Sequence, residues 1–283
     1  MNLKQLLSIA LLTLAFGLNA QSWDVLDGSA LPLDNDPAFD ESCTEPGPNT
    51  SATIVEDPDI PGNQLLSYFS PDPDARMAYK LDFLDWTGPD FTMAIRMRGF
   101  SDIDTLARLF DLEIRNGNAG LRDKVFVNYD NTIEFENAGS SADLGFDVSE
   151  WHIYRVVMSG DALSVYIDEA SDPVISGVTT NSTSDLQFKI ADCSGGNSQG
   201  AIVDWLIWTT DGAYAPGEGP AIPAGLETGT GDIFNPSDFR IAFLTKDVTE
   251  EGFLEEAGLI ADLRQRGFDV DVTYNNPGAI LTP

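Results

Sequence analysis

Apolar and polar residues alternate strictly through most of the chain between residues 77 and 210. In the segment 90–100, Phe91 and Ile95 share an apolar face, whereas Arg96 lies on the polar face. A period of two is typical of antiparallel β-strands that bury one face. Similar runs, with turn residues between them, occupy residues 77–86, 108–117, 124–130, 131–139, 150–169, 185–192 and 201–210. This spacing predicts a mainly β protein, folded as an antiparallel two-sheet jelly-roll sandwich.

The hairpin "EWHIYRVVMSGDALSVYIDE", residues 150–169, contains the only histidine of the sequence. Its pattern W-H-x-x-x-V-x-x-x-G-x-x-L-x-x-Y-x-D resembles the laminin-G-like branch of the concanavalin A-like lectin/glucanase jelly rolls. The segment "GAIVDWLIWTTDGAYAPGE", residues 200–218, resembles the closing strand of the same family. The resemblance covers about residues 22–227 and implies that the pair of Trp151 and His152 is structural. A catalytic His152 would need a nucleophile or a metal beside it.

Enzymes that share this fold often hydrolyse glycans with two carboxylates on one strand, and alternation would place such a pair on one face. Two strands offer pairs of this kind, Asp111 with Glu113 and Glu134 with Glu136, and both pairs are expected on ordinary solvated faces. The alginate-lyase branch of the fold uses Arg-rich, Gln-x-His and Tyr-Lys strand motifs. The sequence contains Arg96, Arg98, Tyr79 and Lys80 but no Gln-x-His motif. The enzyme question therefore stays open and leans towards a non-catalytic domain.

The resemblance also implies a structural calcium ion near the first strand, with Asp204 of the closing strand as a ligand. Acidic residues crowd the N-terminal segment, which is expected to pair near the last strand: Asp24, Asp27, Asp34 and Asp36. Hard carboxylate and carbonyl oxygens suit Ca²⁺. Asp204, Asp24 and Asp27 are therefore the metal-ligand candidates. In the alternative, Asp204 accepts backbone hydrogen bonds and the other aspartates are solvated.

Sugars bound by such jelly rolls rest on aromatic faces with polar rims. Six aromatic residues are candidates for that role: Trp86, Tyr154, Tyr166, Trp205, Trp208 and Tyr214. Trp205 and Trp208 are three positions apart, so on a strand they face opposite sides and at least one belongs to the core. No single sugar-stacking residue follows from the sequence.

Residues 1–20 have the form of a signal peptide, with Lys4 followed by an apolar run from Leu6 to Leu18. No second apolar run has spanning length, so the bacterial-type chain is expected to be secreted or displayed at the cell surface without a membrane span. The only two cysteines, Cys43 and Cys193, would then meet an oxidising compartment. One disulfide is expected, and two free buried thiols are the alternative.

The formal net charge of the chain is −31. Such a surface repels phosphate backbones and anionic lipids, which disfavours nucleic acids and membrane surfaces as partners. It is compatible with neutral glycans, cationic partners and divalent cations. Of these, the jelly-roll resemblance favours a polysaccharide or another glycan as the partner.

The composition changes at residues 212–238, which are rich in Gly, Pro and Thr and read as a linker; its last part, 228–238, separates two domains. Beyond it, residues 239–245 and 269–274 have strand character, and residues 249–268 have helical spacing. This predicts one strand–helix–strand unit over residues 239–283, which resembles the start of a flavodoxin-like or amidotransferase-like α/β domain. One such unit cannot bury both faces of its sheet, so the second domain is expected to be truncated.

These features together predict a secreted, non-catalytic module that binds carbohydrate or a surface within a larger polysaccharide-targeting protein. Two alternatives remain. The first is a glycoside hydrolase or polysaccharide lyase of the same fold, and the second is a structural or adhesive domain that binds protein.

The expected disulfide between Cys43 and Cys193 can be tested directly. In the chain-entropy model a loop of this length stabilises a fold by about 4 to 5 kcal/mol. We therefore expect reductant to lower the midpoint of thermal unfolding, and Cys43→Ser to lower it to a similar extent. Alkylation of the unfolded, unreduced chain should add no label in the mass spectrum. Two labelled cysteines would contradict the expectation.

Overall fold

The computed structural model describes residues 23–45, 47, 49–58, 60–83, 86–101, 105–192, 196–226, 240–245 and 269–274. Internal contacts divide the chain into two compact units, Met1–Gly231 and Asp232–Pro283. The predicted signal peptide (1–20), linker (228–238) and helix (249–268) lie outside the described residues. No helix within the described ranges has both the length and the apolar character that crossing a membrane requires.

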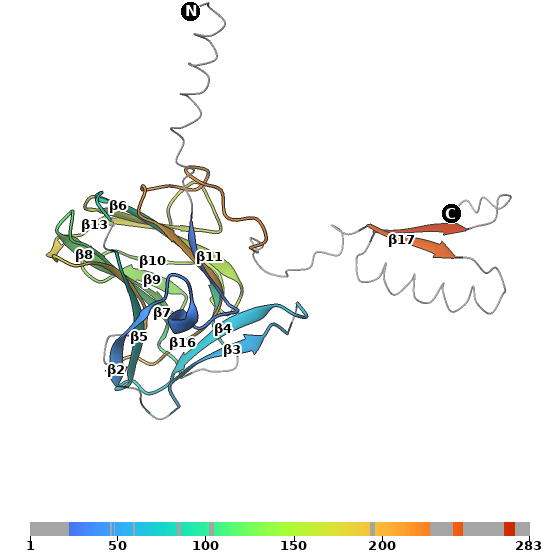
Figure 1. Cartoon of the computed structure of the whole chain (residues 1–283), viewed down its shortest axis with the longest axis horizontal. Coiled ribbons are helices and arrows are strands. Elements are labelled where there is room, and N and C mark those ends of the chain that lie inside the picture. The colour runs from blue at the N-terminus through green and yellow to red at the C-terminus, as the bar shows by residue number, and fades with distance from the viewer. Residues whose placement is uncertain are drawn as a thin grey trace, which may run out of the picture. The chain divides into compact units, whose positions relative to one another are not determined.

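The strands of the first unit form two rows of hydrogen-bonded neighbours (Figure 1). The first row runs in the order β2 (Asp40–Glu45), β5 (Arg76–Asp82), β15 (Leu186–Asp192), β7 (Arg108–Asn116), β8 (Leu121–Asn128), β9 (Thr132–Phe135) and β10 (Ser141–Asp143). The second row runs in the order β3 (Ser51–Glu56), β4 (Gln64–Ser70), β16 (Gln199–Thr209), β6 (Asp90–Arg98), β11 (His152–Ser159), β12 (Ala162–Ile167) and β13 (Ile175–Val178).

Three short elements complete this unit. The strand β1 (Asp24–Asp27) pairs with β16, and β14 (Asn181–Ser182) pairs with β8. A single 3₁₀ turn, η1, spans Pro32–Asp34. The antiparallel, mainly β prediction is confirmed. However, one parallel bridge between Gln199 and Arg108 joins the two rows, so the pairing forms one continuous sixteen-stranded sheet in place of two separate sheets.

The main apolar core lies between the two rows. Phe188 of β15 meets Trp208 of β16 with ring centroids 5.3 Å apart. Tyr68 of β4 meets Phe110 of β7 edge to face at 6.1 Å. These pairs bring together side chains from opposite rows, because alternation sends every second side chain of each strand inwards. The rows therefore pack face to face.

A second, smaller apolar cluster covers the outer face of the second row. Trp205 and Ile153 belong to this cluster, whereas Trp208 and Tyr154 belong to the main core. The prediction that Trp205 and Trp208 face opposite sides is confirmed. The central strands of the second row are thus apolar on both faces.

The Gly- and Pro-rich stretch begins as packed structure and not as a linker, which corrects the interpretation of residues 212–226. Trp23 Nε1 donates to the carbonyl oxygens of Pro220 and Ala221 at 3.1 and 3.0 Å. Ile222 and Leu226 pack against the cluster that contains Trp205. The composition suggested a flexible segment, but Gly212 and Gly219 instead allow the Tyr214 ring to lie close against the backbone.

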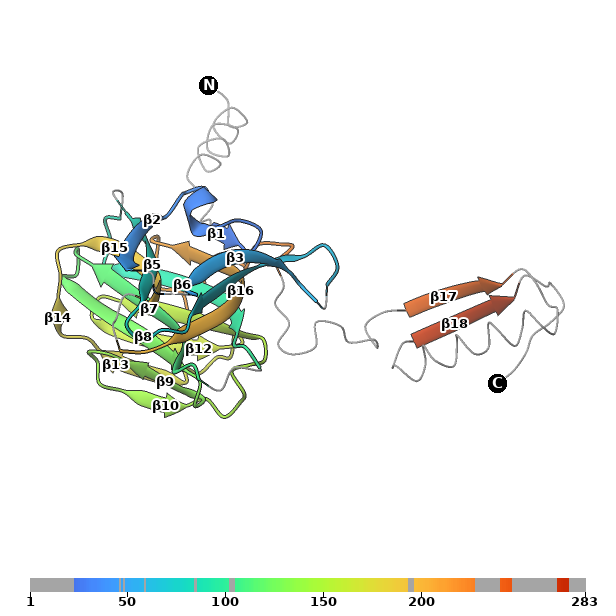
Figure 2. The same ribbon diagram turned by 90° about the horizontal axis from the view of Figure 1, so that it is seen from below.

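The second unit contains two described strands, β17 (Arg240–Thr245) and β18 (Asp269–Tyr274) (Figure 2). They pair in parallel, with Arg240 opposite Asp269 and Thr245 opposite Tyr274. Parallel neighbours need a crossover connection. Both strands were predicted, while the intervening helix and the α/β domain stay predictions because residues 246–268 lie outside the described ranges.

Close packing of Tyr214 provides a test of the folded stretch. Gly219 and Gly217 both have positive φ angles, +67° and +81°. A methyl group at Gly219 would overlap the Tyr214 ring, whereas a methyl group at Gly217 would meet nothing within 4 Å. We expect Gly217→Ala to cost about 1 kcal/mol of unfolding free energy and Gly219→Ala about 2 to 4 kcal/mol. Denaturant unfolding measures both, and equal losses would mean that Tyr214 does not pack against this backbone.

Candidate functional site

Charged side chains line the outer face of the first row. The cross-strand register places Lys80 of β5, Lys189 of β15, Glu113 of β7 and Lys124 of β8 in one line. Two residues along each strand, and therefore on the same face, lies a second line: Asp82, Gln187, Arg115 and Arg122. The alternate residues of the same strands, such as Phe188 and Ile114, belong to the main core. These eight residues in two lines are called the charged face below.

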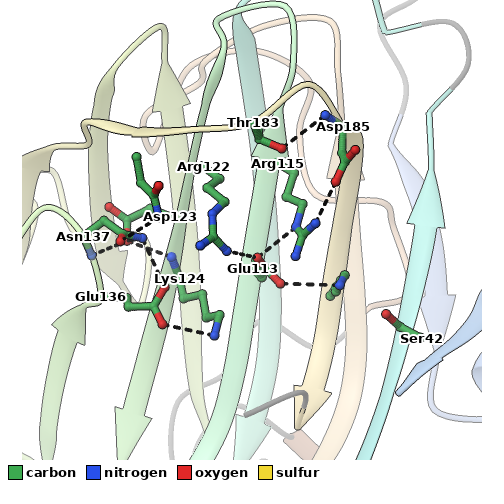
Figure 3. A network of polar contacts seen from close by, with 12 residues as sticks. Ser42, Glu113, Arg115, Arg122, Asp123, Lys124, Glu136, Asn137, Thr183 and Asp185 are labelled. Carbon is green, nitrogen blue, oxygen red and sulfur yellow. Dashed lines mark hydrogen bonds and ion pairs between the residues drawn. The ribbon is translucent and has the colours of Figure 1, made fainter. Parts of the chain in front are cut away.

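Glu113 lies at the centre of the charged face and is only 4% exposed. Its Oε1 accepts hydrogen bonds from Arg115 Nε at 2.9 Å and from Arg122 Nη1 at 3.0 Å. Its Oε2 lies 3.7 Å from Lys189 Nζ. Figure 3 shows Arg115 and Arg122 converging on this carboxylate from two neighbouring strands. One buried anion therefore holds two arginines by hydrogen bonds and lies close to a third cation, Lys189.

The ionisation of Glu113 follows from this arrangement. Burial by itself would raise the pKa of Glu113, but the hydrogen bond and charge of Arg115, with the charges of Lys189 and Lys124, outweigh it. The pKa of Glu113 is thus lowered from its ordinary value of 4.5. Glu113 is a carboxylate at neutral pH, which suits an anchor for cations and does not suit a proton donor.

A hollow of about 320 Å³ opens at the end of the charged face. Asp82, Phe83, Ser184, Asp185, Leu186 and Gln187 line it. Arg115 Nη1 donates to Asp185 Oδ2 at 2.7 Å, while Arg115 Nε bonds to Glu113. The same guanidinium thereby connects the wall of the hollow to the buried carboxylate.

Two of the four carboxylates expected on solvated faces are buried, so that expectation is wrong for Asp111 and Glu113, which are 3% and 4% exposed. Basic side chains cover both: Arg108 lies 3.3 Å from Asp111 and three cations surround Glu113. Glu136 does reach the surface, where it pairs with Lys124 at 3.1 Å.

His152 has the surroundings of a structural histidine. Its Nδ1 lies 2.8 Å from Asp168 Oδ2, and its ring stacks on Phe146 at 3.7 Å between centroids. The other oxygen of Asp168 accepts the backbone N–H of Ile153 at 2.9 Å. These contacts tie the start of β11 to the end of β12 and fit the structural role implied for the Trp–His pair.

Of the residues considered for a lyase, Arg96 and Arg98 meet at Trp151, whereas Tyr79 and Lys80 lie elsewhere. Arg96 is fully buried, pairs with Asp204 at 2.7 Å and lies over the Trp151 ring at 4.4 Å. Tyr79 belongs to the main core. Only Lys80 of this set belongs to the charged face, whereas Arg98 also lies over Trp151, at 4.9 Å.

Two of the three predicted calcium ligands, Asp27 and Asp204, line the same cavity. Asp27 and Asp204 line a cavity of about 310 Å³ together with Asn63, and β1 pairs with β16 as expected. Asp204 accepts from Arg96 and, at 3.3 Å, from Asn63 Nδ2. Asp24 does not line this cavity. Burial, together with the charge of Asp211, raises the pKa of Asp24.

No cluster of three or more metal-ligating side chains occurs within the part of the chain that the structure describes. Calcium at Asp204, Asp27 and Asp24 therefore stays a prediction. The proposed disulfide also stays a prediction, because Cys193 lies outside the described residues. Cys43 of β2 lies opposite Ala78 of β5. On its other side, Ala78 lies opposite Ala191 of β15, and Cys193 follows Ala191 by two positions in the sequence.

Four of the six candidates for sugar stacking are core residues and cannot reach a sugar: Trp86, Tyr154, Trp205 and Trp208. Tyr166 and Tyr214 are half-buried. Sequence reasoning missed Arg115, Arg122, Lys189 and the hollow beside Phe83. The charged residues at positions 113, 115, 122 and 124 are visible in the sequence. Only the strand register shows that they converge on one carboxylate.

No family model matches the chain, and no curated protein matches it. Among solved structures, it is similar to a carbohydrate esterase from the Shiga toxin-encoding bacteriophage phi24B, with 12% identity, a TM-score of 0.42, and 60% of this chain and 88% of that chain covered. A Trypanosoma rangeli sialidase in complex with the inhibitor DANA matches with 13% identity and a TM-score of 0.46, over 68% of this chain and 31% of that chain.

A protein of unknown function from Shewanella oneidensis matches with 13% identity and a TM-score of 0.41, over 78% of this chain and 98% of that chain. The chain spans about a third of the length of the sialidase that it matches. The esterase and sialidase activities belong to those proteins. Likenesses at these identities and TM-scores carry no argument about the activity of this chain.

Removal of the buried charge tests the site. Glu113→Gln leaves Arg115, Arg122 and Lys189 without their shared anion. We expect a loss of about 2 to 3 kcal/mol of unfolding free energy, less than for a fully buried pair because the cations are partly exposed. Glu134→Gln, on the next strand but one, is the matched control and should change the unfolding free energy by less than about 0.5 kcal/mol.

The pH dependence of the same variant gives a second readout. A lowered folded-state pKa means that Glu113 stabilises the fold above its ordinary value of 4.5 and stops doing so as the pH falls through the folded-state value. Wild-type protein should therefore lose more stability than Glu113→Gln between about pH 5 and about pH 3. Parallel stability curves would show that Glu113 is not ion-paired.

Proposed function

We propose that the chain is an exported, non-catalytic carbohydrate-binding module with concanavalin A-like jelly-roll architecture, and that it binds glycan on the charged face. The observation that carries the proposal is the buried, ionised Glu113, which holds Arg115 and Arg122 through hydrogen bonds on the outer sheet face, with Lys189 3.7 Å away. Donors that are fixed before binding lose little conformational freedom on binding, which favours affinity for a polar ligand.

The hollow beside the charged face supports a sugar as that ligand. Phe83 is half-buried and contributes apolar surface, while Asp82, Asp185 and Gln187 contribute acceptors and donors around it. A pyranose ring has a similar division, with apolar C–H faces and hydroxyl groups at its rim. Pockets with an apolar surface and a few placed polar groups are typical of small-ligand sites, and the volume of about 320 Å³ suits one sugar unit.

The non-catalytic character rests on the state of the carboxylates. General acid catalysis of glycoside hydrolysis needs a carboxyl group with a raised pKa, whereas the pKa of Glu113 is lowered. Glu136 pairs with Lys124, and His152 is buried, 8% exposed, with its ring stacked on Phe146. A glycoside hydrolase or polysaccharide lyase is the alternative that the binding experiment below also tests.

Export and calcium complete the proposal. The leader over residues 1–20 would direct the chain to the cell surface or the medium, where glycans are the accessible polymers. Asp27 and Asp204 would hold a structural Ca²⁺ that joins β1 to β16, whereas Asp24 does not line their cavity. The unit from residue 239 would belong to an α/β domain of a larger polysaccharide-targeting protein.

The test is a polysaccharide pull-down with the chain lacking residues 1–20, in calcium and in chelator, with the supernatant assayed for released sugar. We expect retention on at least one insoluble polysaccharide without release of reducing or unsaturated ends. Arg122→Ala should weaken retention about tenfold, because it removes a positioned donor on the charged face. Glu134→Gln should bind as wild type does.

The remaining outcomes separate the alternatives. Release of reducing or unsaturated ends would replace the binding module by an enzyme. No retention on any polysaccharide would overturn the proposal in favour of an adhesive domain that binds protein. Retention and thermal stability that both fall in chelator would support the calcium ion, and unchanged values would remove it.

A further inference from the structure

Lys189 is the cation of the charged face with the weakest pairing. Its Nζ lies 3.7 Å from Glu113 Oε2, which is too far for a hydrogen bond. In the strand register Lys189 lies between Glu113 on β7 and Lys80 on β5. Its side chain is only 11% exposed, so the carbon stem of Lys189 packs against the sheet. An ammonium group whose nearest carboxylate is beyond hydrogen-bond distance can pair with a further anion.

The neighbouring carboxylates each hold a closer cation. Asp82 pairs with Lys80 at 2.6 Å, and Asp185 pairs with Arg115 at 2.7 Å. Glu113 itself is shared with two arginines at shorter range. Burial, together with the charges of Arg115, Lys124 and Lys80, lowers the pKa of Lys189 against the opposing effect of Glu113. At Lys189 the charges of three neighbouring cations, Arg115, Lys124 and Lys80, thus oppose the single charge of Glu113.

We infer that the charged face binds an acidic polysaccharide and that Lys189 pairs with a carboxylate or sulfate group of a bound sugar. This inference rests on the proposed glycan-binding function and adds the chemical class of the glycan. A neutral polymer would cover Lys189 without supplying an anion, which would increase the desolvation of an ammonium group that is already poorly paired.

The acidic surface of the rest of the chain does not prevent this. At physiological ionic strength the Debye length is about 8 Å, so exposed carboxylates further away are largely screened. The charges within a few ångströms of the ligand then decide its binding. The charged face carries two carboxylates, Asp82 and Glu113, and five cations: Lys80, Arg115, Arg122, Lys124 and Lys189. Asp185 and Glu136 pair with two of these cations, and among the described residues Lys189 has no carboxylate within hydrogen-bond distance.

The experiment compares polymers that share a backbone and differ in charge. The chain lacking residues 1–20 is titrated by calorimetry with polygalacturonate and with its methyl ester, and with a sulfated galactan and the same galactan after desulfation. We expect at least one acidic polymer to bind about tenfold or more tightly than its neutral counterpart. The two pairs distinguish a carboxylate from a sulfate as the bound group.

Lys189→Met tests the residue itself. It should abolish the preference for the acidic polymer, and it should not weaken binding of the neutral one, because methionine has no ammonium group to desolvate. Arg76→Gln is the matched control: it removes one positive charge from an exposed position four residues from Lys80 on β5, and it should keep the preference. Thermal unfolding of both variants verifies that they fold.

Each outcome decides a different claim. Equal affinities for the acidic and neutral polymers, or a preference that survives Lys189→Met, would overturn the inference and leave the glycan-binding function intact. Absence of binding to any polymer in the pull-down series and in these titrations would overturn the proposed function itself.

Discussion

Apolar packing between the two rows of strands is the interaction on which the rest of the molecule depends. Phe188 and Phe39 both contact Trp208, so the centres of the two rows are joined through aromatic rings. Because side chains alternate along a strand, this packing also decides what faces outwards. Once Phe188 points into the core, its neighbours Gln187 and Lys189 must lie on the opposite surface of β15.

The outward surface of the second row is covered by other parts of the chain, whereas that of the first row carries charged side chains. On the second row, Trp205 and Ile153 are covered by the folded stretch 212–226, and the Arg96–Asp204 pair is buried beside Trp151. On the first row, the outward surface carries the charged face and the hollow lined by Phe83. The proposed glycan would therefore meet a polar surface that the buried charge of Glu113 organises. The same charge that restricts the cations also removes Glu113 from acid catalysis.

Much of the fold follows from the sequence, because alternation is a local property. The run at 90–100 became β6, and the run at 201–210 became β16. The strands β2, β3 and β4 were not predicted: β3, "SATIVE", is a half-buried edge strand without a clean apolar face, and the segment around it is rich in Pro and Gly. The charged face could not be predicted either, since Lys80, Glu113 and Lys189 come from distant segments and meet only through strand register.

Side-chain NMR of the arginines tests most directly whether the charged face is the glycan-binding surface. In ¹⁵N-labelled protein, the Nε–Hε resonances of Arg115 and Arg122 report on the charged face. Those of Arg96 and of Arg155, a buried residue of β11 that pairs with Glu169 at 2.7 Å, report on the outer face of the second row. Titration with an oligosaccharide of a polymer that binds should shift the first pair and leave the second pair unchanged. Shifts confined to Arg96 and Arg155 would place the ligand on the other face and contradict the assignment of the site.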